Sequence, residues 1–310
     1  MTEWRVVTQR QPVARKSNAV RISRRAGQDW PMARFASYDG TQIGYRALGD
    51  GPPLVCLPGG PGRTCEYFGD LGGLSRSRQL IMPDTRGTGE SADASDPLSY
   101  RCDRLVGDVE ALRAYLGLDR MDLLGHSAAG DLATLYAAAF PQRVAHLILL
   151  TPGLDAVGVE ETDEQWRAGL ARRSAEPWYP AALAAVEKAE AGDESMDNRR
   201  AYMPFLYGRW DNAAQAHVDA GVSERSRPAR DGFRAEGAFN PPKTREAVSR
   251  LTAPVLVYAG ELDAAPVPET AAAGARLFPN ATVTVQPGAA HFPWLDDPAF
   301  FTATITSFLS

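Results

Sequence analysis

Apolar and polar positions along the chain fall into short blocks with two alternating periodicities. Apolar or β-branched runs of strand length occur at residues 54–57, 79–83, 121–124, 144–150, 254–259 and 281–286. Between them, apolar residues recur at helical spacing over residues 100–116, 131–140, 268–278 and 297–309. Strands that alternate with helices are typical of a mostly parallel sheet with helices on both faces. The pattern therefore predicts an α/β fold.

The start of this pattern differs from the rest. Residues 33–38 and 41–47 flank the pair Asp39-Gly40, and an Asp-Gly pair favours a tight hairpin turn. We therefore expect an antiparallel hairpin ahead of the parallel strands. The next run, residues 54–57, has no polar position, as expected of a central strand that is buried on both faces.

The alternation stops between residues 154 and 248. This stretch is rich in alanine, glutamate, arginine and aromatic residues at helical spacing, and it contains no strand-like run. We interpret it as a helical cap inserted after the sixth strand. Residues 32–153 and 249–310 then form one core domain, with the cap over the edge of the sheet where the sites of α/β proteins form.

Residues 1–31 are basic, with seven lysines and arginines against two acidic residues. They lack the apolar stretch of a secretory signal. A basic arm of this kind could bind an acidic partner. We expect instead a disordered tail, or residues upstream of a true start at Met32.

Composition narrows the range of functions. The net charge of −5 argues against nucleic acid as the main partner, and no apolar run reaches the length of a membrane span. The three cysteines, Cys56, Cys65 and Cys102, fit neither a disulfide framework nor a metal site. We therefore expect a cytoplasmic protein without metal or cofactor that acts on a small molecule or a short peptide. The sequence leaves its oligomeric state open.

The strongest chemical signal lies at residues 125–130, with the sequence GHSAAG. An apolar run ends there, a helical pattern begins, and Ser127 lies between them among small residues. This arrangement predicts a nucleophile elbow, in which a serine hydroxyl projects above the edge of a sheet. The usual pattern is G-x-S-x-G, and here Ala129 replaces the last glycine.

A serine nucleophile needs a base, and the chain has only four histidines. His126 adjoins the serine, so the elbow directs it elsewhere. His146 lies within an apolar strand, and His217 lies in the cap. His291 follows the last strand, at the same edge of the sheet as the elbow, and is therefore the candidate base.

A carboxylate between serine and histidine in the chain would complete a Ser-Asp-His order. Asp263 follows the strand 254–259 and is our candidate, with Glu261 in reserve. Both residues also fit a solvated turn. However, serine, aspartate and histidine at three predicted strand ends, in this order, form a rare combination.

With these motifs, residues 33–310 resemble an α/β-hydrolase-fold enzyme with a cap. The segments 59–62 (GGPG) and 84–91 (DTRGTGES) resemble the proline iminopeptidase family. The resemblance implies an oxyanion hole formed by the backbone N–H groups of Gly60 and Ala128. For Asp84 and Arg86 we expect a structural role, in which hydrogen bonds fix the loop after the strand 79–83, rather than a chemical one.

The chain departs from that family at two places. Pro58 stands where the family has histidine, and Ala128-Ala129 replaces a tryptophan and a glycine after the serine. The family binds a free amino terminus with acidic cap residues, and four are available here: Glu160, Glu161, Asp163 and Glu164.

We therefore expect a serine hydrolase that acts on an ester, an amide or a short peptide through an acyl-enzyme. The alternatives are a proline iminopeptidase proper, a lyase or cyclase of a natural-product pathway on the same triad, and a receptor that retains the fold.

Overall fold

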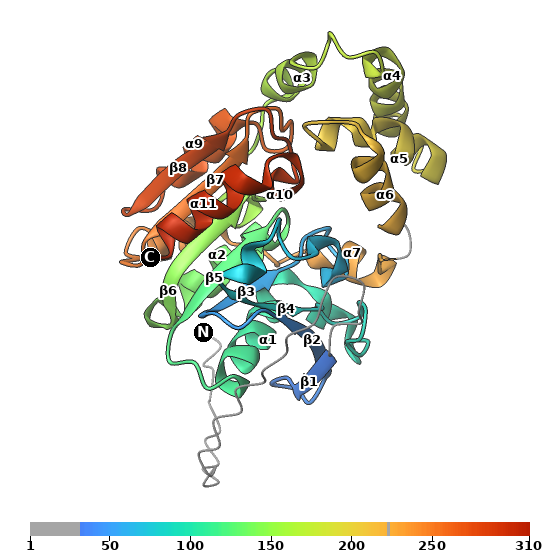
Figure 1. The fold of residues 1–310 in the computed structure, drawn as a ribbon. Helices are drawn as coiled ribbons and strands as arrows, with labels where there is room; N and C mark the ends of the chain where they lie inside the picture. Colours follow the sequence, from blue (N-terminus) through green and yellow to red (C-terminus); the bar gives the residue numbers. More distant parts are fainter. Residues whose placement is uncertain (1–31, 222–223) are drawn as a thin grey trace, which may run out of the picture.

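The computed structural model describes residues 32–221 and 224–310. The expectation for residues 1–31 lies outside this range. Within it, the chain forms one eight-stranded sheet with the order β1-β2-β4-β3-β5-β6-β7-β8 (Figure 1). The strands are β1 Met32–Ala36, β2 Gln42–Leu48, β3 Pro53–Leu57, β4 Gln79–Pro83, β5 Met121–His126, β6 Val144–Leu150, β7 Val255–Gly260 and β8 Ala281–Gln286.

The sheet is mostly parallel, as predicted. β1 and β2 form the expected antiparallel hairpin, and β2 also pairs antiparallel with β4. All other neighbours pair in parallel. The carboxyl ends of β5, β7 and β8 therefore meet at one edge, where the site forms.

Helices cover both faces of this sheet. The core helices are α1 Cys102–Tyr115, α2 Ala129–Ala139, α9 Pro268–Ala275, α10 Pro293–Asp296 and α11 Pro298–Phe308. Alternate residues of each central strand enter different clusters, because successive side chains of a strand point to opposite faces. Leu123 packs in the cluster that contains α1, α2 and α9, whereas Leu124 packs with Phe301 of α11.

Helix ends follow local chemistry. α1 begins at Cys102, later than the predicted residue 100, because Tyr100 closes a 3₁₀ turn and Arg101 is extended. Asp297 caps α11 by accepting hydrogen bonds from the N–H groups of Ala299 and Phe300. The predicted closing helix is thus confirmed.

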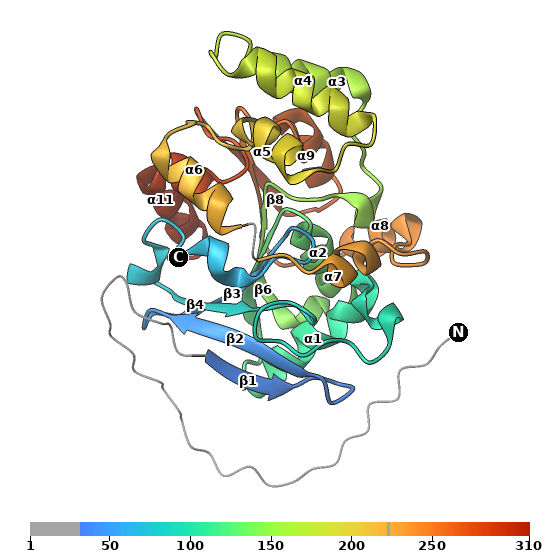
Figure 2. The ribbon, with the colours of Figure 1, turned by 90° about the vertical axis from the view of Figure 1, so that its right-hand side faces the viewer.

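In its described residues, the segment between β6 and β7 forms helices and no strand of the sheet. It contains α3 Asp163–Ala171, α4 Tyr179–Glu190, α5 Met196–Tyr202, α6 Asn212–Ala220, α7 Arg227–Phe233 and α8 Pro241–Val248. Both views show α3, α4, α5 and α6 gathered on the side of the molecule remote from β1 (Figures 1 and 2). We call residues 154–248 the cap. Its last helix, α8, packs back against α2.

The cap has a small cluster of its own. Leu170, Ala182, Val186 and Phe205 pack together, and Ala264 of the core joins them. Because Ala264 follows Asp263, this cluster reaches the loop that carries the candidate carboxylate. No helix within residues 32–221 and 224–310 is long and apolar enough to cross a bilayer.

Candidate active site

Ser127 lies at the apex of a sharp turn between β5 and α2. Its φ of 54° is left-handed, a conformation that costs energy for a residue with a side chain. Its carbonyl oxygen accepts hydrogen bonds from the N–H groups of Gly130 and Gly153, both at 2.7 Å. A Cβ on Gly125 would lie 2.3 Å from the carbonyl oxygen of Ala129, so this position requires glycine. The turn is therefore held by close backbone contacts, and Ala129 is accommodated within it.

The structure brings the three predicted side chains together. His291 Nε2 lies 2.9 Å from Ser127 Oγ, and His291 Nδ1 lies 2.8 Å from Asp263 Oδ2. Asp263 is fully buried, and its other oxygen accepts the N–H of Ala265 at 3.0 Å. The three residues follow β8, β5 and β7, so the sheet edge itself fixes their separation.

The other candidates lie elsewhere. His146 Nδ1 lies 2.8 Å from Asp122 Oδ1, near the amino ends of β5 and β6. The carboxylate of Glu261 accepts the N–H of Gly288 at 2.7 Å. Neither residue reaches the Ser127–His291 pair.

The glycine-rich loop after β3 lies directly against the elbow. A Cβ on Gly59 would lie 2.6 Å from the carbonyl oxygen of His126 and 2.7 Å from Ser127 Cβ. Within the described residues, the N–H groups of Gly60 and Ala128 have no hydrogen-bond acceptor. Two free donors beside a serine hydroxyl are what an oxyanion hole requires.

A second hydrogen-bond chain runs beneath the site. The Gly59 N–H donates to the Tyr67 hydroxyl at 2.8 Å, and that hydroxyl lies 2.7 Å from His126 Nδ1. His126 Nε2 lies 3.0 Å from the carbonyl oxygen of His291. Since an amide N–H only donates and a carbonyl only accepts, Tyr67 donates to Nδ1 and His126 donates from Nε2.

His126 must be neutral for this chain to hold. Burial, followed by the neighbouring His291, lowers the pKa of His126 well below its usual range. Thr151, another residue with positive φ, also donates to the carbonyl oxygen of His291, at 3.1 Å. The glycine loop and the backbone of His291 are thus linked through Tyr67 and His126. Sequence reasoning missed Tyr67 and Thr151, because neither lies in a motif.

The cap is joined to the glycine loop. Arg63 Nε donates to the Glu224 carboxylate at 2.8 Å, and both side chains are buried. The N–H of Thr64 donates to the carbonyl oxygen of Glu224 at 2.9 Å, and the N–H of Ser226 donates to that of Gly62 at 2.8 Å. The Arg63 guanidinium also lies over the Tyr67 ring, 4.3 Å from its centre. The end of the cap therefore follows the loop that carries Gly60.

His217 contributes to the same contact between cap and core. The Tyr207 hydroxyl lies 2.7 Å from its Nδ1, and its Nε2 lies 3.0 Å from the carbonyl oxygen of Tyr67. Burial, then the charge of Arg63, lowers the pKa of His217 to about 4. His217 is thus a neutral packing residue rather than a second base.

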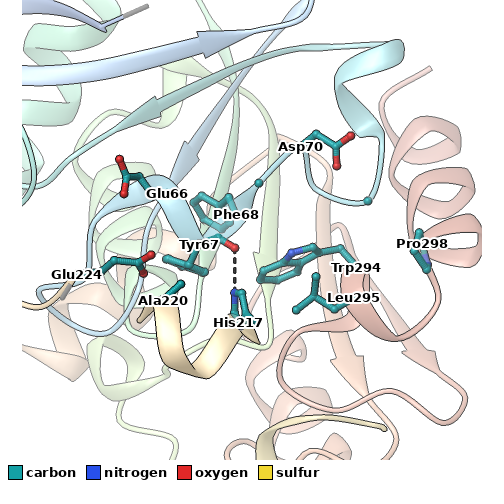
Figure 3. Close-up of a pocket in the computed structure, with 12 residues that line it drawn as sticks. Glu66, Tyr67, Phe68, Asp70, His217, Ala220, Glu224, Trp294, Leu295 and Pro298 are labelled. Carbon is teal, nitrogen blue, oxygen red and sulfur yellow. Dashed lines mark hydrogen bonds between the residues drawn. The ribbon is translucent and has the colours of Figure 1, made fainter. Parts of the chain in front are cut away.

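A cavity of about 340 Å³ lies beside these residues (Figure 3). Its aromatic walls include Tyr67, Phe68, His217 and Trp294, and no triad residue lines it. Its three carboxylates are already engaged. Glu66 pairs with Arg46, Asp70 accepts the N–H of Gly73, and Glu224 pairs with Arg63.

The predicted loop support is confirmed. Asp84 accepts the N–H groups of Cys65 at 2.8 Å and Glu90 at 3.1 Å. Fully buried Arg86 donates to Asp108 at 2.9 Å and to Asp39 at 2.7 Å.

The three cysteines are free and buried, as expected of structural thiols. Burial raises the pKa of each thiol. The parts of the chain that the structure describes hold no group of three or more potential metal ligands.

The sequence matches one family over most of its length. The family model for the alpha/beta hydrolase fold matches residues 52–298, most of the chain. The chain therefore belongs to the alpha/beta hydrolase fold family, and the predicted fold class is confirmed. The protein is an alpha/beta hydrolase.

Its relatives include two kinds of hydrolase. A proline iminopeptidase from Heyndrickxia coagulans is 27% identical over 294 residues, which cover 89% of this chain and 98% of the relative. An esterase from Rhodococcus sp. ECU1013 superposes with a TM-score of 0.67 at 26% identity, over 90% of this chain and 98% of that one. A proline iminopeptidase from Mycobacterium smegmatis gives a TM-score of 0.69 at 22% identity, over 90% and 97%. The resemblance to proline iminopeptidases is thus confirmed, alongside a similar structural likeness to an esterase.

Proposed function

We propose that this protein is a serine hydrolase that cleaves an ester or amide through an acyl-enzyme on Ser127. The observation that carries the proposal is the unbroken chain from Ser127 Oγ through the His291 ring to Asp263, with distances of 2.9 and 2.8 Å. Such a chain supplies nucleophile, base and orienting carboxylate in one geometry.

The direction of the hydrogen bonds supports these roles. When Ser127 donates to His291 Nε2, the ring carries its proton on Nδ1 and donates it to Asp263. As Oγ attacks the acyl carbon, its proton passes to Nε2, and Asp263 stabilises the imidazolium. The proton then moves to the leaving group as the bond to it breaks. Water, activated by the same ring, releases the acid and restores Ser127.

The negative charge that develops on the acyl oxygen needs donors. The N–H groups of Gly60 and Ala128 lack acceptors among the described residues, which supports their proposed role as the oxyanion hole. Removal of one such donor in a comparable site costs about 10²–10³ in turnover. The Tyr67–His126 chain holds the loop that presents Gly60.

A proline iminopeptidase is the second candidate, favoured by the relative that is 27% identical over 89% of this chain. That activity requires an acidic group to bind the free amine of the substrate. Of the four acidic residues considered, Glu161 accepts the N–H of Val267. Glu160, Asp163 and Glu164 are exposed. The structure therefore offers less support for this candidate than for an esterase.

The test is labelling and turnover of the Ser127→Ala variant. We expect a fluorophosphonate to label the wild-type protein and not the variant. Hydrolysis of p-nitrophenyl acetate should fall by about 10⁶, to the background rate. Ser249→Ala, which removes an exposed serine at the end of α8, is the matched control and should retain both properties.

Unaltered hydrolysis of p-nitrophenyl acetate by Ser127→Ala would contradict the proposal. Labelling without hydrolysis of any ester or amide would contradict it as well and favour a lyase or cyclase. Faster cleavage of proline β-naphthylamide than of p-nitrophenyl esters would favour the iminopeptidase.

A further inference from the structure

Two arginines lie side by side next to the proposed oxyanion loop. Arg63, three residues after Gly60, pairs with Arg225 of the cap in an isolated antiparallel bridge. Hydrogen bonds on both sides of this bridge, from Thr64 to Glu224 and from Ser226 to Gly62, fix the two backbones. Arg225 is therefore held beside the loop by its own backbone.

The Arg63 guanidinium is incompletely satisfied. The residue is 5% exposed, and its Nε donates to Glu224. Its Nη2 is buried, lies close to Gly221, and has no hydrogen-bond partner among the described residues. Buried polar groups are nearly always paired, so an unpaired N–H on a buried cation indicates a site that is only partly filled.

Arg225 has no compensating charge of its own. Within residues 32–221 and 224–310, no carboxylate forms an ion pair with it. The residue is exposed to solvent, and partial desolvation followed by the positive charges of Arg63 and Arg199 lowers the pKa of its guanidinium. The nearby carboxylate of Glu224 is already bound to Arg63. Two cations thus share one anion, and the region has an excess of positive charge.

We propose that Arg225, with Arg63 beside it, binds a carboxylate on the substrate, so that the preferred substrate is an ester or amide that also carries a free acid group. This inference rests on the proposed function. An anion between the two guanidinium groups relieves their mutual repulsion and accepts charge-assisted hydrogen bonds. A substrate with a free amine is repelled by the same charges.

The position of the bridge restricts the substrate. Arg63 lies three positions after Gly60, which spans at most about 11 Å of chain, so the acid group lies several bonds away from the carbonyl that Ser127 attacks. A half-ester of a dicarboxylic acid meets this condition, and a simple acetate ester does not. The glutarate series is therefore a suitable set of probes.

The experiment compares kcat/KM for three p-nitrophenyl esters of equal length, corrected for spontaneous hydrolysis. They are the anionic glutarate half-ester, the neutral valerate and the cationic 4-(trimethylammonio)butyrate. We expect the wild-type protein to prefer the anionic ester over the neutral one by about 10- to 100-fold, the range of one or two charge-assisted hydrogen bonds. The cationic ester should be the poorest substrate.

Arg225→Gln should abolish this preference, because kcat/KM for the anionic ester falls by about 10- to 100-fold and kcat/KM for the valerate falls far less. Arg225→Lys keeps the charge but loses the planar fork, so it should retain part of the preference. The matched control is Arg227→Gln, two residues along, whose side chain is 83% exposed and pairs with Asp231. That variant should behave like the wild-type protein.

Equal kcat/KM for the anionic and neutral esters in the wild-type protein would overturn the inference, as would an unchanged preference in Arg225→Gln. Both results leave the proposed function standing. If no ester is cleaved and Ser127 is not labelled, the proposed function fails instead. Titration calorimetry with glutarate then tests the arginine site alone. Binding that is lost in Arg225→Gln supports the site, and absence of binding to the wild-type protein refutes it.

Discussion

At the sheet edge, Ser127 and His291 are fixed from several sides. The turn of Ser127 is closed by two hydrogen bonds of 2.7 Å to its carbonyl oxygen, and the carbonyl oxygen of His291 is held by both His126 and Thr151. The cap makes its contact differently. It reaches the same site through the buried ion pair Arg63–Glu224, a short backbone bridge and the contact of His217 with the Tyr67 carbonyl oxygen. The carbonyl oxygen of Leu206 in the cap also accepts the N–H of His291 at 3.1 Å.

This difference separates two tasks. Bond cleavage needs reacting groups held at hydrogen-bond distance, which strand ends provide because the sheet sets their spacing. Choice of substrate needs charge and shape, which a separate helical layer can change without moving the triad. We call the residues at the sheet edge the sheet-edge wall and the cap residues that contact them the cap wall. Variants of the sheet-edge wall should affect turnover, and variants of the cap wall should affect substrate preference, so the two can be tested independently.

Among variants that keep Ser127, Asp263→Asn is expected to have the largest effect on turnover. Because the Ala265 N–H keeps the amide oxygen as its acceptor, the new NH2 group faces His291 Nδ1 and donates to it. This fixes the wrong tautomer of His291, so kcat should fall by about 10⁴ with little change in KM. Asp122→Asn is the matched control, since Asp122 also contacts a histidine, at 2.8 Å, but away from the site. Steady-state kinetics on p-nitrophenyl valerate provide the measurement. Equal losses in both variants would show that the effect is merely structural.

Tyr67→Phe should have a smaller effect. It removes the acceptor for the Gly59 N–H and the donor to His126, so the loop that presents Gly60 loses its anchor. We expect kcat to fall by about 10- to 100-fold, below the loss of an oxyanion donor itself. Tyr258→Phe is the control, because that buried hydroxyl bonds to Gln286 and its ring packs on Phe301. It should lose stability and keep kcat. If both variants lose only stability, Tyr67 is a packing residue and does not position the loop that carries Gly60.

Most of the sheet-edge wall was predictable from the sequence. Parallel strands bring their carboxyl ends together, so residues that follow predicted strands meet even when far apart in the chain. This rule predicts that Ser127, Asp263 and His291 lie together, and the structure brings them within hydrogen-bond distance. Glu261, held in reserve, differs from Asp263 by only two positions. That distinction depends on how the loop turns, and the strand pattern does not specify it.

The contact between the cap and the glycine loop was not predictable in the same way. Glu224 and Arg63 are separated by 161 positions, and neither lies at a strand end or in a motif. Their contact depends on how the cap folds back, which the helical pattern of residues 154–248 does not determine. His126 illustrates the same limit. Its position next to Ser127 indicated that it points away from the reaction, but its partner Tyr67 comes from another segment.

The smallest effect on activity is expected at Asp131, where a substitution should change the stability of the core rather than turnover. Asp131, in the first turn of α2 after Ser127, is fully buried. Burial is the main cause that raises its pKa to about 7. One oxygen accepts the N–H of Ala156 at 2.8 Å, while the other lies 3.9 Å from Arg234 Nη2. This carboxyl therefore prefers to be protonated in the folded protein.

Asp131→Asn tests this charge. Between pH 4 and pH 7 the folded state binds a proton that the unfolded state releases, so the free energy of unfolding of the wild-type protein falls as pH rises, by up to about 4 kcal/mol from this group. An asparagine keeps the acceptor for Ala156 and removes the titration. Its stability relative to wild type should therefore increase from pH 4 to pH 7 and then level off, as measured by urea unfolding, while kcat at pH 8 changes little. Asp155→Asn removes a half-buried partner of Arg234 and one of the charges that raise the pKa of Asp131, so it should show a smaller trend. A loss of stability in Asp131→Asn at pH 8 would mean that Arg234 holds Asp131 in its charged form. Arg234 of the cap would then stabilise the turn at Ser127 through Asp131. The cap and the sheet edge would be less independent than their contacts indicate.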